Sequence, residues 1–516
     1  MALNSRLRIV IPVVVILLAL AAVLARFHDD IASVDSLFSS HKAAPAPVPA
    51  GGADDKPRPE SKPEPEPEPE PKPKTPKYKP APSYTPPPVI DPFPLLANTA
   101  DDLPPIPSHN VPRKDLHREY GLDAAPPLFI GFTRQWPILL QCVVSYVTAG
   151  WPAEHIYVLE NTGVQVANAQ GKLSLQNPFY LNHTTLERLG VNVIRTPALL
   201  SFSQMQNMFL HTAHEKGLPY YFYSHQDVVV FSMEDGADDT HRPGDRKWEF
   251  YDEKEKEETM EPPAAGQPGY RTIYENCLRD LDTVTKRGEK WAFRWYQYDH
   301  LTLVNRAAMD SIGGWDSLIP YYATDCDMNA RLMMDGWTTK HRRVGIINDI
   351  SVHMEDLAAL YRVPGVEPSW RDPNPPPPEQ RAKEEKEAKE AEEKRQAEEK
   401  KKQGDAPPPP AETPDAPPKN PGPMDRYHAV VKAALEMTNY KYRGGNHNRN
   451  SWQKSQRGGE GEPYYYSPEG FAEAFDVLVG AGRQIFEKKW GRGKCDIGEG
   501  FGLKVADQWH VLHSDD

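Results

Sequence analysis

Between residues 127 and 224 the sequence alternates short apolar runs with amphipathic helical patterns, and this alternation restricts the fold more than any other feature. Apolar runs of strand length occur at 128–132, 155–159, 191–194 and 220–224. Apolar residues at helical spacing separate them at 138–146 and 203–214. Strands that alternate with helices predict an α/β fold, with a mostly parallel sheet flanked by helices and right-handed crossovers.

Polar residues follow three of these predicted strands at the points where the strands end. They are Thr133 and Arg134, then Glu160 and Asn161, and then His225, Gln226 and Asp227. In a parallel α/β sheet, ligands bind beyond the carboxyl ends of the strands. The sequence therefore predicts that these residues contact a cofactor or substrate, although Glu160 also fits a solvated strand end and Arg134 an ordinary surface charge.

A second polar signal follows a glycine turn about a hundred residues later. The stretch 313–316 reads Gly-Gly-Trp-Asp, and after a short spacer 324–327 reads Thr-Asp-Cys-Asp, followed by an apolar helical pattern. Asp325 and Asp327 thus lie two residues apart at a predicted helix N-terminus, where the helix dipole favours negative charge. Taken alone, such a pair also fits a helix N-cap beside a solvated acid.

The strand that ends in Asp227 and the acidic helix start together resemble the GT-A class of nucleotide-sugar glycosyltransferases. More narrowly, the chain is similar to the family 2-like inverting enzymes, in the form of a fungal-type type II membrane protein. The resemblance covers about residues 127–357 and implies a GT-A (Rossmann-like) fold. In that family an Asp-x-Asp motif ends the fourth strand and holds a divalent metal with the sugar diphosphate. Asp227 matches the second Asp, and His225 stands in place of the first.

The same resemblance implies the chemistry of the site. Asp325 takes the position of the catalytic base, with Thr324 in place of the usual Glu. The base accepts the acceptor's proton while C1 of the sugar is attacked from the opposite face. Asp227 and His353 are the implied ligands of Mn²⁺ or Mg²⁺, with a hydrogen-bonded histidine as the alternative for His353. Because His225 replaces an acid, the metal site is expected to be weaker than a full Asp-x-Asp site.

Three further residues are candidates for contacts with the donor. Trp315 either stacks on a sugar face or packs under the sheet. Asp327 either orients the helix start, beside the donor, or competes with Asp325 as the base. Arg294 is, like Arg134, a candidate for the diphosphate, because arginine forms bidentate bonds with phosphate.

The N-terminal residues 1–30 have the pattern of a signal anchor. The run from Ile9 to Ala25 is apolar and about 17 residues long, at the short end of what spans a bilayer. Arg6 and Arg8 precede it, which predicts a cytosolic N-terminus and a lumenal body in the ER or Golgi membrane. A cleaved signal peptide is the alternative.

The 54 prolines of the chain are concentrated in two segments, which divides it into parts. Residues 31–126 are predicted to be a Pro-rich disordered stem, because such a composition does not bury a core. The catalytic domain is expected at 127–372, with an insertion loop at 233–270. A charged helical linker flanked by prolines follows at 373–423. The C-terminal helical segment, 424–516, is expected to pack on the body, with an independent lobe as the alternative.

The four cysteines suggest one disulfide at most. Cys142 lies in an apolar helical pattern and is expected to be a buried free thiol. Cys326 pairs with either Cys277 or Cys495 if the body is lumenal.

Charge and motifs narrow the function. A net charge of −13 without a basic stripe argues against nucleic-acid binding. No Gly-x-Ser-x-Gly elbow or His-Glu-x-x-His helix supports a hydrolase. The favoured function is a membrane-anchored, metal-assisted, inverting glycosyltransferase that moves a sugar from a nucleotide-sugar donor to a glycan, glycoprotein or glycolipid. A GT-A-like binding or scaffold protein without turnover is the alternative.

Overall fold

The structure is a computed structural model that describes residues 75–80, 85–97, 102–236, 248–375, 377, 386, 422–443, 454, 456–463, 467–497 and 502–513. The predicted signal anchor at 1–30, the first part of the predicted stem and nearly all of the predicted charged linker lie outside these residues. Within the described ranges, every helix is too short or too polar to cross a bilayer.

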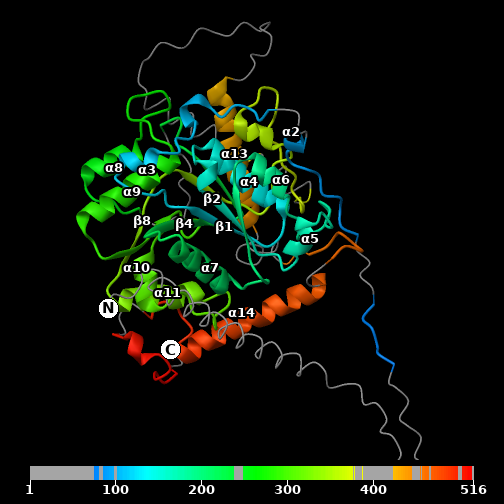
Figure 1. The fold of residues 1–516 in the computed structure, drawn as a ribbon, viewed down its shortest axis with the longest axis vertical. Helices are drawn as coiled ribbons and strands as arrows, with labels where there is room; N and C mark the ends of the chain where they lie inside the picture. The colour runs from blue at the N-terminus through cyan, green and yellow to red at the C-terminus, as the bar shows by residue number, and fades with distance from the viewer. Residues whose placement is uncertain are drawn as a thin grey trace, which may run out of the picture. The chain divides into compact units, whose positions relative to one another are not determined.

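A seven-stranded sheet forms the centre of the fold (Figure 1), in the order β3-β2-β1-β4-β7-β6-β8. Its strands are β1 (Leu128–Phe132), β2 (Ile156–Glu160), β3 (Asn192–Arg195), β4 (Tyr220–Ser224), β6 (Trp291–Tyr296), β7 (Leu301–Asn305) and β8 (Thr338–His341). β3, β2, β1 and β4 are parallel neighbours, β7 is antiparallel to β4 and β6, and β8 is parallel to β6. The predicted α/β class with a mostly parallel sheet is confirmed.

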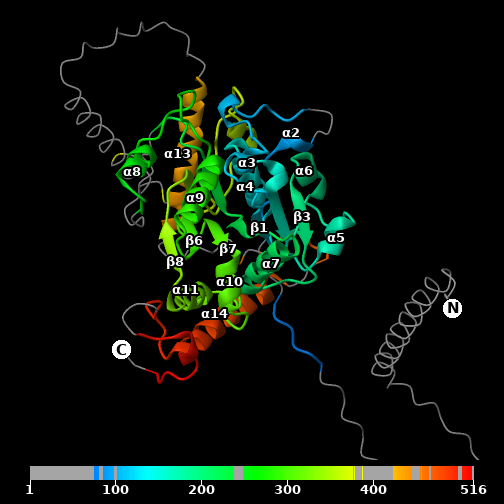
Figure 2. The same cartoon turned by 60° about the vertical axis from the view of Figure 1, so that its left-hand side comes forward.

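Helices cover both faces of this sheet. They are α2 (Pro94–Ala97), α3 (Leu116–Glu119), α4 (Trp136–Thr148), α5 (Gln165–Ala169), α6 (His183–Arg188), α7 (Phe202–Glu215), α8 (Glu253–Met260), α9 (Ile273–Arg287), α10 (Arg306–Ile312), α11 (Thr324–Met334), α13 (Pro423–Tyr442) and α14 (Pro468–Trp490). Short 3-10 helices are η1 (Ser108–Asn110), η2 (Ala153–His155), η3 (Leu357–Tyr361) and η6 (Val505–Asp507). Figures 1 and 2 show α4, α9 and α13 on one side of the sheet and α7, α10 and α11 on the other.

The core of each face follows from the period-two alternation of the strands. In β1, Leu128 and Ile130 belong to the apolar cluster that includes residues of α4 and α9. Phe129, between them, belongs to the opposite cluster and stacks on Phe209 of α7 at a ring-centroid distance of 5.2 Å. A strand that is apolar on both sides is what a sheet between two helical layers requires.

Two strands lie outside the main sheet and bring distant segments together. β5 (Val228–Phe231) pairs antiparallel with β9 (Ile346–Asp349), and the register places Val228 opposite Asp349. β9 ends at Asp349, so His353 lies four residues beyond the end of the strand. Because Asp227 directly precedes β5, this pairing places two carboxylates next to each other.

The predicted stem ends earlier than residue 126, because residues within 93–116 are buried in the core of the body. Phe93, Leu96 and Leu116 are buried in the core cluster of α4. The ring centroid of Phe93 lies 5.7 Å from that of Tyr361 in η3. The apolar residues scattered among the prolines are enough to hold this stretch against the domain, which the Pro-rich composition alone did not indicate.

The C-terminal helices contact the body. α13 contacts β9 and η3, and α14 contacts α11. A disulfide joins Cys326 in α11 to Cys495, which follows α14. This is one of the two pairings left open by the sequence. Cys142 is a buried free thiol, and Cys277 is also buried and free.

Candidate active site

The glycine turn before α11 is fixed by a side chain of α7. Gly313 and Gly314 both have left-handed backbone angles, with φ of 75° and 76°. Asn207 clamps the next residue: its Oδ1 accepts from the Trp315 backbone N–H at 2.9 Å, and its Nδ2 donates to the Trp315 carbonyl at 2.8 Å. A Cβ atom at position 314 would lie 2.7 Å from Asn207 Oδ1. Glycine is therefore required at position 314, and Gly313 in the left-handed conformation is the C-cap of α10.

Asp325 lies in the first turn of α11 and is the candidate base. The helix N-cap is Ala323, so neither Asp325 nor Asp327 caps the helix. The Tyr298 hydroxyl donates to Asp325 Oδ2 at 3.2 Å. Burial raises the pKa of the Asp325 carboxyl, and the negative charge of Asp299 raises it further. A carboxylate whose pKa is raised holds a proton more readily, which is what a general base requires.

The turn between β6 and β7 brings Tyr298 and Asp299 to this carboxylate. Gln297 and Tyr298 both have positive φ, 58° and 59°, an uncommon conformation for two adjacent residues other than glycine. Backbone strain of this kind concentrates at functional sites. This turn was not predicted, because residues 291–305 are apolar and aromatic on both sides of it. The available signal was the polar pair Asp299 and His300 in the middle of that segment.

His225 lies between the carboxylates of Asp227 and Asp299. Its Nε2 lies 3.5 Å from Asp299 Oδ2, and its Nδ1 lies 4.0 Å from Asp227 Oδ1. Burial lowers the pKa of His225, but the carboxylates of Asp299, Asp227 and Asp349 outweigh burial and raise the pKa to about 8. The imidazole is therefore mostly cationic at neutral pH.

This raised pKa predicts a pH dependence of stability. Because the pKa of His225 lies above the ordinary 6.5, the protonated ring stabilises the fold fully below pH 6.5, and this contribution is lost as the pH rises through 8. Relative to His225→Gln, the wild-type free energy of unfolding should fall by about 2 kcal/mol across that window. Urea unfolding of both proteins at pH 6, 7 and 8.5 measures it. Parallel pH profiles would contradict the assignment.

Asp227 does not stand alone, because a lysine of α13 lies between it and Asp349. Lys441 Nζ donates to Asp227 Oδ2 and to Asp349 Oδ1, both at 2.6 Å, and to the Ile350 carbonyl at 3.0 Å. The Tyr442 hydroxyl donates to Asp349 Oδ2 at 2.6 Å. Burial raises the pKa of the Asp349 carboxyl, but the charge of Lys441 outweighs burial, so the net shift is downward.

Together these groups form one continuous set, which we call the polar cluster. It consists of His225, Asp227, Tyr298, Asp299, His300, Asp325, Asp349, Lys441 and Tyr442. Its members come from the ends of β4 and β9, the β6–β7 turn, the start of α11 and the end of α13. The structure thus brings the predicted Asp227, His225 and Asp325 together, and it adds residues that the sequence analysis did not single out.

The predicted metal ligands do not fit a divalent cation as these side chains lie. The Asp227 carboxylate is bound by the Lys441 ammonium, and His353 Nδ1 lies 2.9 Å from the Met354 carbonyl. Among the residues that the structure describes, no three His, Cys, Asp or Glu side chains are arranged to hold a metal. A positive charge is nevertheless present beside Asp227, and it belongs to the protein.

The residues at the end of β2, Glu160 and Asn161, form hydrogen bonds with neighbouring segments of the protein. Glu160 is fully buried and accepts hydrogen bonds from Asn168 Nδ2 at 3.0 Å and His183 Nε2 at 2.8 Å. Asn161 bonds the backbone of Leu200 in both directions, through its Nδ2 and its Oδ1. Both side chains are therefore engaged within the protein, and neither belongs to the polar cluster.

The ends of β1 and β4 are joined by Gln226. Its Nε2 donates to the Arg134 carbonyl at 2.7 Å, and its Oε1 accepts from the Thr133 backbone N–H at 3.3 Å. The Arg134 guanidinium lies 4.6 Å from the ring centroid of Phe471 in α14, and burial lowers its pKa to about 9. Thr133, Arg134 and Gln226 thus lie at the edge of the sheet where ligands were expected, with α14 over the arginine.

Three predicted contacts of the donor lie in the interior instead. Trp315 is 3% exposed and packs on Phe202 at a ring-centroid distance of 5.7 Å, which matches the packing alternative. Asp327 is fully buried, and Lys489 Nζ lies 2.7 Å from its Oδ1. Arg294 is fully buried in β6, and its nearest acid is Glu289 at 3.4 Å.

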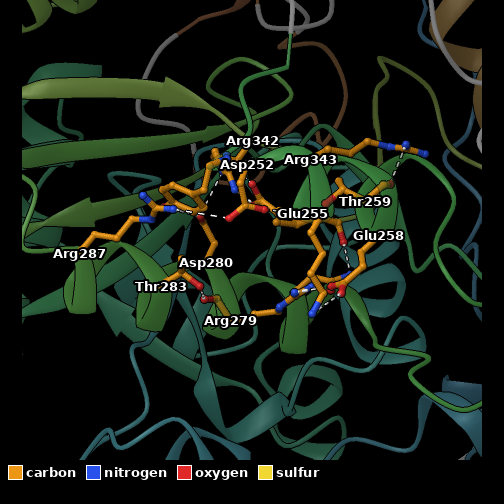
Figure 3. A pocket seen from close by; sticks show the side chains of 14 residues that line it. Asp252, Glu255, Glu258, Thr259, Arg279, Asp280, Thr283, Arg287, Arg342 and Arg343 are labelled. Atoms are coloured by element: carbon orange, nitrogen blue, oxygen red, sulfur yellow. Dashed lines mark hydrogen bonds and ion pairs between the residues drawn. The ribbon is translucent and has the colours of Figure 1, made fainter.

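A separate cavity of about 180 Å³ lies between α8, α9 and residues 342–344 (Figure 3). Most of the charged side chains that line it form ion pairs with one another. The pairs are Arg279 with Glu258, Arg287 with Asp252, and Arg342 with Glu255. The cavity shares no residue with the polar cluster, and its charges hold the predicted insertion, through α8, onto α9.

Comparisons with known proteins give little beyond this geometry. No protein-family model matches the sequence, and no curated protein matches it. Among solved structures, the chain is similar to the mannosyltransferase PcManGT from Pyrobaculum calidifontis, in complex with GDP-Man and Mn²⁺, at 11% identity and a TM-score of 0.24. The match covers 45% of this chain and 61% of that one, less than two thirds of its length. A TM-score this low carries no argument about activity.

Proposed function

We propose that this chain is a glycosyltransferase that moves a sugar from a nucleotide-sugar donor to a hydroxyl of an acceptor, with inversion at C1. The observation that carries the proposal is Asp325, a carboxylate with a raised pKa that Tyr298 orients at the start of α11. It lies in one polar cluster with the ends of β4 and β9, and Asp299 links it to His225.

In the proposed reaction, Asp325 takes the proton of the acceptor hydroxyl. The acceptor oxygen forms a bond to C1 of the sugar from the face opposite the diphosphate. The bond between C1 and the diphosphate oxygen breaks, and its electron pair leaves with the nucleoside diphosphate. The raised pKa improves Asp325 as a base near neutral pH, and the hydrogen bond from Tyr298 holds one carboxylate oxygen in place.

His225 is the candidate counter-charge for the leaving diphosphate. Its pKa of about 8 makes the ring cationic at neutral pH. Its side chain is 28% exposed, so it is the more accessible cation of the cluster, while Lys441 is 1% exposed. Positive charge near developing negative charge lowers the barrier in a site that excludes water.

The donor class, the acceptor class and the compartment are also proposals. A nucleoside diphosphate sugar is the donor, and a glycan, glycoprotein or glycolipid is the acceptor. We place the body in the lumen of the ER or Golgi, held to the membrane by residues 1–30. The Cys326–Cys495 disulfide supports this placement, because disulfides persist in oxidising compartments.

A binding or scaffold protein with the same architecture but without turnover is the second candidate. One observation favours it: Lys441 engages the carboxylate of Asp227, a group expected to hold the donor's metal, together with that of Asp349. A protein of this kind would bind a nucleoside diphosphate or a glycan and release no nucleotide.

Release of free nucleotide separates the two candidates. Wild-type protein is assayed with a panel of UDP- and GDP-sugars and mixed glycan acceptors, with Asp325→Asn as the matched blank. The proposed enzyme releases nucleotide from at least one donor, well above the blank. Binding of a nucleotide without release from any donor would favour the scaffold.

A further inference from the structure

The position of Lys441 is set by the packing of α13 on the body. The buried residues of this helix include Tyr427, Val430, Ala434 and Met437, at intervals of three and four, and Lys441 continues the same stripe. At the start of the stripe, the Tyr427 hydroxyl donates to the Ser232 carbonyl at 2.9 Å, just after β5. The helix therefore directs Lys441 into the body beside β5 and β9.

The surroundings of the Lys441 ammonium are those of a coordinated cation. Its three N–H donors are matched by three oxygens, at 2.6, 2.6 and 3.0 Å, from Asp227, Asp349 and the carbonyl of Ile350. Burial lowers the pKa of Lys441, but the two carboxylates outweigh burial, so the net shift is upward and the group stays charged. Two carboxylates and a carbonyl are also oxygen ligands that a hard divalent cation uses.

We propose that Lys441 is a built-in cation that replaces a divalent metal at the Asp227–Asp349 pair. A metal reaches these oxygens only by displacing an ammonium that is buried, charged and fully hydrogen-bonded. The consequence for nucleotide binding rests on the proposed function: a nucleoside diphosphate binds without a metal at this pair. The cation replacement itself is a property of the cluster and can be tested without any substrate.

The first test measures Mn²⁺ binding to the full-length chain, from the electron paramagnetic resonance signal of free Mn²⁺. Wild-type protein and Asp227→Asn should bind Mn²⁺ equally weakly. Lys441→Met removes the ammonium, leaves two facing carboxylates and should bind Mn²⁺ at least tenfold more tightly than wild type. Adding Asp349→Asn to that variant should abolish the gain. Lys432→Met, at an exposed position of the same helix, is the matched control and should behave as wild type.

The second readout is thermal stability. Without metal, Lys441→Met should lower Tm by roughly 5–15 °C, because it leaves buried carboxylates without their counter-charge. Mn²⁺ at a hundredfold excess over its Kd should recover about 5 °C or more of that loss. The Tm of the wild type and of Lys432→Met should not respond to Mn²⁺.

Stoichiometric Mn²⁺ binding by the wild type that Asp227→Asn abolishes would overturn the proposal. A folded Lys441→Met that gains no Mn²⁺ affinity would overturn it as well. If Lys441→Met fails to fold, the comparison of wild type with Asp227→Asn decides alone.

Calorimetry with UDP and GDP separates this proposal from the proposed function. The affinity of the wild type for either nucleotide should be the same within twofold in EDTA and in Mn²⁺. A rise of tenfold or more with Mn²⁺ that depends on Asp227 would show that a metal binds at the Asp227–Asp349 pair and would contradict the proposal. If neither nucleotide binds while Lys441→Met still gains Mn²⁺, the glycosyltransferase assignment fails and the built-in cation stands.

Discussion

Asp325→Asn is expected to lower the rate of sugar transfer by about 10²–10⁴-fold, the usual worth of a general base. Asparagine keeps the volume of the side chain and still accepts from the Tyr298 hydroxyl, but it does not take up a proton. Nucleotide affinity should stay within about threefold of wild type if the carboxylate acts mainly on the acceptor. Initial rates of nucleotide release, together with calorimetric nucleotide affinity and Tm, measure the three effects separately.

Asp335→Asn is the matched control, since Asp335 caps the other end of α11 and is exposed. It should leave turnover unchanged. Wild-type turnover in Asp325→Asn would remove Asp325 from the role of base. If Asp327→Asn instead abolished turnover while the protein stayed folded, the base would lie two residues further along the chain.

The sequence predicted the sheet because its strands and helices carry strong local periodicity. The runs at 128–132 and 220–224 became β1 and β4 without any change of boundary. Strand ends at one edge of a parallel sheet lie close together, so His225 and Asp227 were expected near one site. The acidic pair at the predicted helix start after the Gly-Gly turn identified Asp325 as a candidate from local sequence alone.

The polar cluster as a whole was not predictable in the same way. Lys441 lies 214 residues from Asp227 in sequence, and no local pattern relates the two. In the structure the buried stripe of α13 includes Lys441, and a lysine at a buried helical position needs a carboxylate partner. Which carboxylate it meets depends on how α13 packs on β9, which is a tertiary property.

At two places the structure differs from what local composition predicts. Proline content suggested that the stem reached residue 126, but Phe93 and Leu116 are buried in the core. At Asp327, the position near a helix start suggested a cap or a donor contact, whereas two of its partners, Lys489 and Trp490, come from α14, more than 160 residues away. In both cases a long-range contact decides what the residue does.

Asp327→Asn is therefore expected to act on stability, and strongly. Asp327 Oδ1 accepts from the Trp490 indole N–H at 2.9 Å and lies 2.7 Å from Lys489 Nζ, and its Oδ2 accepts from Arg331 Nε at 2.8 Å. Asparagine provides only one of the two acceptor oxygens and no charge, so Arg331 and Lys489 are left in the interior with less compensation. Removing one partner of a buried ion pair costs about 3–5 kcal/mol.

Urea unfolding of Asp327→Asn should show that loss, far above the roughly 1 kcal/mol expected for a helix cap. Asp496→Asn is the matched control: Asp496 pairs with Arg492 close to the same helix, but its side chain is 48% exposed. An exposed pair of this kind contributes under about 1 kcal/mol. Equal losses in the two variants would contradict a buried network at Asp327. Because Asp327 joins α11 to α14, its loss should also loosen the helix that carries Asp325, so turnover should fall only as the fold does.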